Sequence, residues 1–133
     1  MRKPRPSYKD IIDWKAFNYL VDKTTKYSDM GYHAHVCAKL RNGEYDSSYE
    51  SIYYTNIMAD GEIINAKPEF TEAPMKPKNY NFYKEYGVFY SIWIQRAGGG
   101  WPNFADEIYE TIKSKFDKVY VDHMHTLIVK VKE

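Results

Sequence analysis

The sequence predicts an α+β fold, with a mainly antiparallel sheet of about five strands and two helices packed on one face. Several stretches alternate between apolar and polar residues, which is typical of half-buried strands. Two other stretches have apolar residues three or four positions apart, which is typical of amphipathic helices. The turn signals Asn42-Gly43 and Asp60-Gly61 follow strand-like stretches, and turns of this kind join antiparallel neighbours.

The first helix is predicted over about residues 8–23. Ser7, with Asp10 three residues later, resembles a capping box and marks its beginning. Its apolar residues recur at helical spacing: Ile11, Trp14, Phe17, Leu20 and Val21. The second helix is predicted to open at Pro102-Asn103, with Asn103 as the cap. Its buried stripe is formed by Phe104, Ile108, Ile112 and Phe116.

Strands are predicted at residues 32–41, 51–59, 62–66, 86–96 and 118–132. Residues 67–79 contain three prolines and several lysines, so we expect a loop there. The triplet Gly98 to Gly100 lacks the spacing of a dinucleotide-binding motif and the Lys-Ser/Thr of a P-loop. We therefore expect no nucleotide cofactor.

A length of 133 residues fits a single domain over residues 1–133. Residues 1–6 hold three basic residues and are expected to be a flexible arm. A formal net charge of +1 gives no overall field that would attract nucleic acid or a membrane. The lone Cys37 excludes an intrachain disulfide, and no apolar run is long enough to cross a bilayer. These features predict a cytoplasmic protein without a membrane partner.

The source is left open by composition. A single glutamine, Gln95, hints at a thermophile, because thermolabile amides are depleted in such proteins. Abundant lysine, tyrosine and isoleucine are equally expected from an AT-rich viral or phage genome, in which case the compartment would be the host cytoplasm. A homodimer is also expected, since the stretch 86–96 has two faces to cover and only two helices are predicted.

All four histidines fall into two copies of one pattern, His33-Ala34-His35 and His123-Met124-His125. Side chains two apart on a strand share a face, so each pair would place both imidazoles together. Paired imidazoles suit metal binding or acid–base chemistry near neutral pH. For the second pair, the alternative is two buried structural histidines, each hydrogen-bonded to a neighbour. In a regular last strand the second pair would share the more apolar face, unless a bulge at Asp122 shifts the phase.

The octapeptide from Asp122 to Val129 resembles the His-hydrophobe-His signature of the HUH endonucleases, over less than a tenth of the chain. The resemblance implies that His123 and His125 hold a divalent metal (Mn, Mg or Zn) that polarises a phosphodiester. It also implies a tyrosine nucleophile on a nearby helix. Tyr109 is the best candidate, and Lys113 shares its helix face and would stabilise the charge on the transferred phosphate. This tyrosine-first order occurs among relaxases.

Two strand-borne histidine motifs about ninety residues apart also resemble the two-histidine phosphoesterases. That resemblance implies metal-free phosphodiester cleavage, with one histidine as base and the other as acid. This family's Thr or Ser position is occupied here by His35 and His125. A third interpretation is a four-histidine metal site in which His33, His35, His123 and His125 converge.

The non-catalytic alternative is a single-stranded nucleic-acid-binding protein. Aromatic residues make up 17% of the chain, and 14 of them are tyrosines, which suit base stacking as well as a core. The expected stacking residues are Phe89, Trp93, Tyr53, Tyr80 and Tyr83. The expected phosphate contacts are Lys39, Arg41, Lys78, Lys84 and Arg96. The sequence-based hypothesis is phosphodiester cleavage in nucleic acid or nucleotides through the histidine pairs, with binding alone as the alternative.

Overall fold

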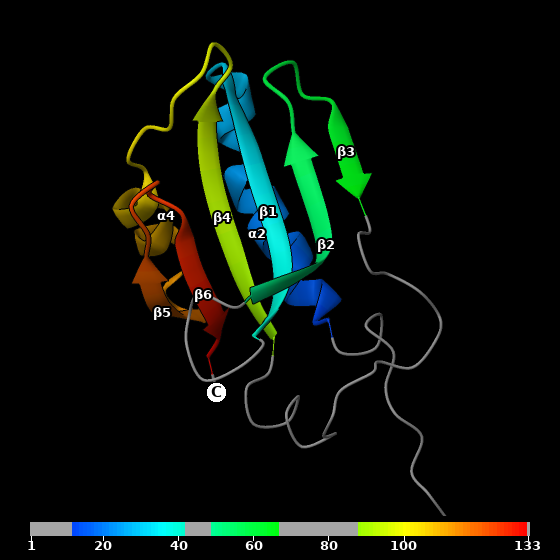
Figure 1. The fold of residues 1–133 in the computed structure, drawn as a ribbon, viewed down its shortest axis with the longest axis vertical. Coiled ribbons are helices and arrows are strands. Elements are labelled where there is room, and N and C mark those ends of the chain that lie inside the picture. The colour runs from blue at the N-terminus through cyan, green and yellow to red at the C-terminus, as the bar shows by residue number, and fades with distance from the viewer. Residues whose placement is uncertain (1–11, 42–48, 67–87, 133) are drawn as a thin grey trace, which may run out of the picture.

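The computed structural model describes residues 12–41, 49–66 and 88–132 of the chain (Figure 1). These residues form two helices and six strands, so the α+β class predicted from the sequence is confirmed. In chain order the elements are α2 (Trp14–Asp29), β1 (Tyr32–Arg41), β2 (Tyr49–Ile57), β3 (Ile63–Ala66), β4 (Val88–Arg96), α4 (Ala105–Ile112), β5 (Phe116–Val121) and β6 (Leu127–Val131).

The six strands form one sheet in the order β3-β2-β1-β4-β6-β5, and every neighbouring pair is antiparallel. β1 and β4 occupy the middle of the sheet and run side by side over nearly their full length (Figure 1). Hairpins account for the pairs β1–β2, β2–β3 and β5–β6. The pairing of β1 with β4 joins residues that are far apart in the sequence, from Leu40 with Val88 to Tyr32 with Arg96, and no local signal in the sequence fixes that register.

Both described helices lie on the same face of the sheet (Figure 1). The alternation within β1 explains this, because Ala34, Val36 and Ala38 are fully buried and face α2. Phe17 and Leu20 of α2 pack into the same core. Burial of apolar side chains of this size contributes about 1.5–3 kcal/mol each, so this face fixes the position of the helices.

α2 begins and ends about six residues later than predicted. The side chain of Asp13 caps its first turn, because Oδ1 accepts a hydrogen bond from the Ala16 amide at 3.0 Å. The proposed cap Ser7 lies outside the described residues. The helix continues to Asp29 because Tyr27 is fully buried against Phe104 and Thr24 Oγ1 donates to the Leu20 carbonyl. Because Thr24 and Tyr27 carry polar groups, the apolar pattern in the sequence stops before the helix does.

α4 is shorter than predicted and is capped differently. It begins after Phe104, whose side chain makes no capping hydrogen bond, so the predicted cap at Asn103 is wrong. It ends at Ile112, and a turn closed by a hydrogen bond from the Lys115 amide to the Ile112 carbonyl follows. Phe116, expected on the helix, begins β5 opposite Val131.

The predicted single strand over residues 118–132 is also wrong, because the chain reverses within it. β5 ends at Val121, a turn occupies residues 122–126, and β6 begins at Leu127. This hairpin adds the sixth strand. The basic arm at residues 1–6 and the loop at residues 67–79 lie outside the described residues. Within the described part, none of the helices is long and apolar enough to cross a membrane.

Candidate functional site

The face of the sheet that points away from α2 and α4 carries the first histidine pair. We call it the histidine face; its β1 residues are His33, His35, Cys37 and Lys39. The register between β1 and β4 places Gln95 opposite His33 and Trp93 opposite His35. Directly opposite residues of an antiparallel pair lie on the same face, so these side chains are neighbours.

Three rings form a ladder across the histidine face. The His35 imidazole lies between Tyr54 from β2 and Trp93 from β4. Its centroid is 5.8 Å from the Tyr54 ring at an interplanar angle of 23°, and 4.6 Å from the Trp93 ring at 30°. Neighbouring strands lie about 4.8 Å apart, so one ring per strand at this spacing gives a nearly parallel stack. We call Tyr54, His35 and Trp93 the ring ladder.

Both ring nitrogens of His35 are occupied by hydrogen bonds. Nδ1 lies 3.0 Å from the Tyr54 hydroxyl, and Nε2 lies 3.2 Å from Oε1 of Gln95. Because an amide oxygen can only accept, Nε2 carries the proton and Nδ1 accepts from the tyrosine. Burial lowers the pKa of His35 below its usual 6.5, and the Gln95 hydrogen bond only partly opposes this. His35 is therefore a neutral, fixed member of the ladder at neutral pH.

His33 also has a structural partner. Its Nδ1 accepts a hydrogen bond from the Ala59 amide at 2.9 Å, just after β2 ends. This bond ties the turn between β2 and β3 to the beginning of β1. Each histidine of the first pair is thus held by at least one neighbour.

The second pair lies in a turn and not on a strand. Oδ1 of Asp122 accepts hydrogen bonds from the amides of Met124, at 2.8 Å, and Thr126, at 2.9 Å. His125 has a φ of 62°, in the left-handed region, which reverses the chain within a few residues. His123 is exposed at this turn. The two imidazoles therefore lack the shared strand face that the period-two argument required.

The structure keeps the two pairs on different parts of the sheet, because β4 lies between β1 and β6. Among the residues that the structure describes, no group of three or more His, Cys, Asp or Glu side chains is placed to hold a metal ion. The four histidines are all in that part of the chain. The convergence expected for a four-histidine site is thus not seen.

The expected nucleophile Tyr109 lies on the helix side of the sheet. It packs against the core, and the Lys118 ammonium lies 5.4 Å from its ring centroid. Lys113 is exposed and pairs with Glu110 at 2.8 Å, a contact that raises the pKa of the lysine. The sheet therefore separates Tyr109 from His33 and His35.

The expected nucleic-acid contacts divide between the two faces. Trp93 and Phe89 lie on the histidine face, and Lys39 lies opposite Phe89. Arg96 ends β4 opposite Tyr32, on the helix side, and Tyr53 packs on Trp14 at 5.0 Å, also on the helix side. Four expected contacts fall outside the described residues: Lys78, Tyr80, Tyr83 and Lys84. Arg41 is the last residue of β1, and its side chain is outside the described part as well.

A hollow of about 270 Å³ opens beside the ring ladder. Its lining residues are His35, Cys37, Lys39, Tyr54, Ser91, Trp93 and Thr126. Sequence reasoning had not assigned Tyr54, Cys37, Ser91 or Thr126 to a site. The alternation placed Ser91 on the same face as Trp93, but only the distant register of β1, β4 and β6 brings these residues together.

Two buried polar atoms on the histidine face have no hydrogen-bond partner among the residues that the structure describes: the Trp93 Nε1 donor and the Asn56 Oδ1 acceptor. More than nine-tenths of buried polar groups in native proteins are paired, and leaving one unpaired costs about 1–3 kcal/mol. An indole N–H can only donate. The Trp93 donor is thus a buried N–H beside the hollow that has no acceptor among the described residues.

Comparisons of the chain with protein-family models, with curated proteins and with solved structures each found no match. The residues themselves define the class: an α+β protein whose antiparallel sheet carries an aromatic ladder and a small hollow on the face away from its helices. The function is accordingly argued from the geometry of that face.

Proposed function

We propose that this protein binds single-stranded nucleic acid through the histidine face, with one base stacked beside the ring ladder. The ring ladder carries the proposal. Aromatic rings on the open face of a sheet are a recurrent way to hold unpaired bases, and each stacked base contributes about 1–3 kcal/mol. In this protein Tyr54, His35 and Trp93 stand at the spacing of stacked rings, one per strand.

The hollow has the size and polarity for one planar ring. Its volume of about 270 Å³ is below the roughly 300–1,000 Å³ of pockets that enclose a whole drug-sized ligand. The Ser91 and Thr126 hydroxyls can donate or accept at the edge of a base. Lys39 lines the same hollow and supplies a positive charge for a phosphate.

The same geometry favours binding over cleavage. A general base needs a free nitrogen near the scissile bond, and both nitrogens of His35 are engaged. A tyrosine nucleophile has to face the same substrate as the histidines, and Tyr109 lies across the sheet from them. Binding needs neither of these groups to move.

The test is the affinity of the untagged protein for a fluorescently labelled single-stranded oligonucleotide, measured by anisotropy in low salt. We expect Trp93→Ala to weaken binding by about tenfold or more, since it removes a stacking surface. Trp93→Phe keeps a ring and should lose less. Trp101→Ala is the matched control, because Trp101 is 45% exposed in the segment before α4. Equal affinities of wild type and Trp93→Ala, or no binding by wild type, would contradict the proposal.

A further inference from the structure

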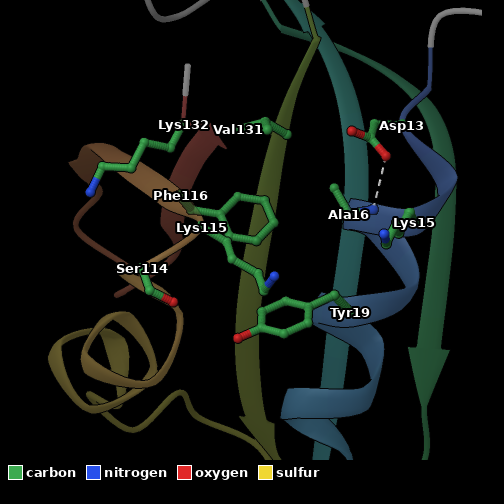
Figure 2. A pocket seen from close by; sticks show the side chains of 9 residues that line it. All are labelled: Asp13, Lys15, Ala16, Tyr19, Ser114, Lys115, Phe116, Val131 and Lys132. Atoms are coloured by element: carbon green, nitrogen blue, oxygen red, sulfur yellow. Dashed lines mark hydrogen bonds between the residues drawn. The ribbon is translucent and has the colours of Figure 1, made fainter.

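A second, larger hollow lies on the other side of the sheet, between the first turns of α2 and the β5–β6 hairpin (Figure 2). Its volume is about 460 Å³, within the range of pockets for small organic ligands. We call it the lysine groove. Its lining residues are Asp13, Lys15, Ala16, Tyr19, Ser114, Lys115, Phe116, Val131 and Lys132.

The floor of the lysine groove is apolar. The Tyr19 and Phe116 rings are stacked, with centroids 6.0 Å apart and an interplanar angle of 25°. Phe116 is buried, whereas Val131 leaves 36% of its surface exposed at the end of β6. Ala16 adds a small side chain from α2. An apolar or aromatic part of a ligand would cover this floor and remove it from water.

The rim of the groove is positively charged. Three lysines line it, Lys15, Lys115 and Lys132, against one carboxylate, Asp13. The Lys132 ammonium donates to the Lys113 carbonyl at 3.2 Å and points away from the floor (Figure 2), so Lys15 and Lys115 supply the positive charge of the rim. The Asp13 carboxylate already accepts the Ala16 amide as the cap of α2. The Lys115 ammonium extends back over the Tyr19 ring, 5.4 Å from its centroid (Figure 2). The lysines that line the groove therefore give its rim a net positive charge above an aromatic floor.

We propose that the lysine groove binds a nucleoside monophosphate or a phosphorylated molecule of similar size and shape. The lysines at the rim would hold the phosphate, for which lysine acts as a point charge, and the rings of the floor would receive the planar part. An extended acidic partner fits less well, because Lys15 and Lys115 line a ligand-sized hollow. This site is separate from the histidine face and does not depend on the function proposed for it.

The first experiment is isothermal titration of AMP, adenosine and inorganic phosphate into the wild-type protein. AMP is expected to bind one molecule per chain and more tightly than either of its parts. Adenosine binding as tightly as AMP would overturn the assignment of the lysines to the phosphate. Inorganic phosphate binding as tightly as AMP would overturn the role of the apolar floor.

The location is tested with variants. Lys15→Gln combined with Lys115→Gln should weaken AMP at least about tenfold, which corresponds to about 1.4 kcal/mol. Lys26→Gln combined with Lys118→Gln is the matched control, because it removes the same two charges at positions that do not line the groove. All four lysines are exposed, and a circular dichroism spectrum identical to wild type verifies the fold. Wild-type affinity in the double variant, or loss of AMP binding in Trp93→Ala alone, would overturn the proposal.

Discussion

His35 shows how one residue can look like a catalyst in the sequence and serve as a scaffold in the structure. Its imidazole has Tyr54 on one side and Trp93 on the other, and both nitrogens are hydrogen-bonded. A histidine held in this way keeps its orientation but has no lone pair to spare. Its contribution is the rigidity of the ring ladder.

The pKa of His35 is a direct test of this environment. Burial lowers it below 6.5, so the folded state takes up a proton less readily than the unfolded chain. The stability that His35 contributes is present above about pH 6.5 and is lost as the pH falls through the folded-state pKa. A titration of the imidazole resonances by NMR should place His35 below 6.5. A midpoint at or above 6.5 would contradict the described burial.

At the scale of elements, the β5–β6 hairpin depends on Asp122. One carboxylate oxygen satisfies two amides of the turn, those of Met124 and Thr126. These two hydrogen bonds stabilise a turn between two stretches whose sequence pattern is that of a strand. The turn brings Thr126 to the histidine face, so the hairpin also completes the hollow.

Asp122→Ala should therefore lower the free energy of unfolding by about 1–3 kcal/mol, because it leaves two amides of the turn without their acceptor. Urea denaturation followed by circular dichroism measures the change. Asp22→Ala, at an exposed position of α2, is the control and should change stability by less than about 0.5 kcal/mol. Equal stability of Asp122→Ala and wild type would show that the turn does not depend on the carboxylate.

Elements with a clean pattern were predictable, and elements ended by polar side chains were not. The bounds of β1 agree with its alternation from Tyr32 to Arg41. The end of α2 was missed because Thr24 and Tyr27 are polar by type yet buried in this helix. The sequence does not predict the break at Asp122, because apolar residues alternate on both sides of it and a bulge would account for the same pattern.

At the scale of the whole molecule, the order and register of the strands determine which candidate residues lie close together. The sequence pointed to the first histidine pair and to Trp93, and the structure places them together on one face. The sequence does not predict the register of β1 with β4, because these strands are distant along the chain. The predicted placement of both helices on one face is confirmed, and the sheet separates Tyr109 on that side from His33 and His35.

The metal hypothesis is tested at this scale, because it requires distant elements to converge. A protein zinc site uses three or four ligands, and the described residues form no such group. We expect titration of Mn²⁺ or Zn²⁺ to give the same weak isotherm for wild type and for the variant His123→Ala/His125→Ala. Stoichiometric binding by wild type that this variant loses would instead support the metal-dependent cleavage implied by the HUH resemblance.

The most direct test of the central claim is an NMR titration that observes the indole N–H signals of the three tryptophans. Trp93 lines the hollow, Trp14 packs against the core on the helix side, and Trp101 lies in the segment before α4. On addition of a single-stranded oligonucleotide, we expect the Trp93 signal to shift strongly while those of Trp14 and Trp101 stay in place. An unchanged Trp93 signal under conditions in which the oligonucleotide binds would contradict the proposed role of the histidine face.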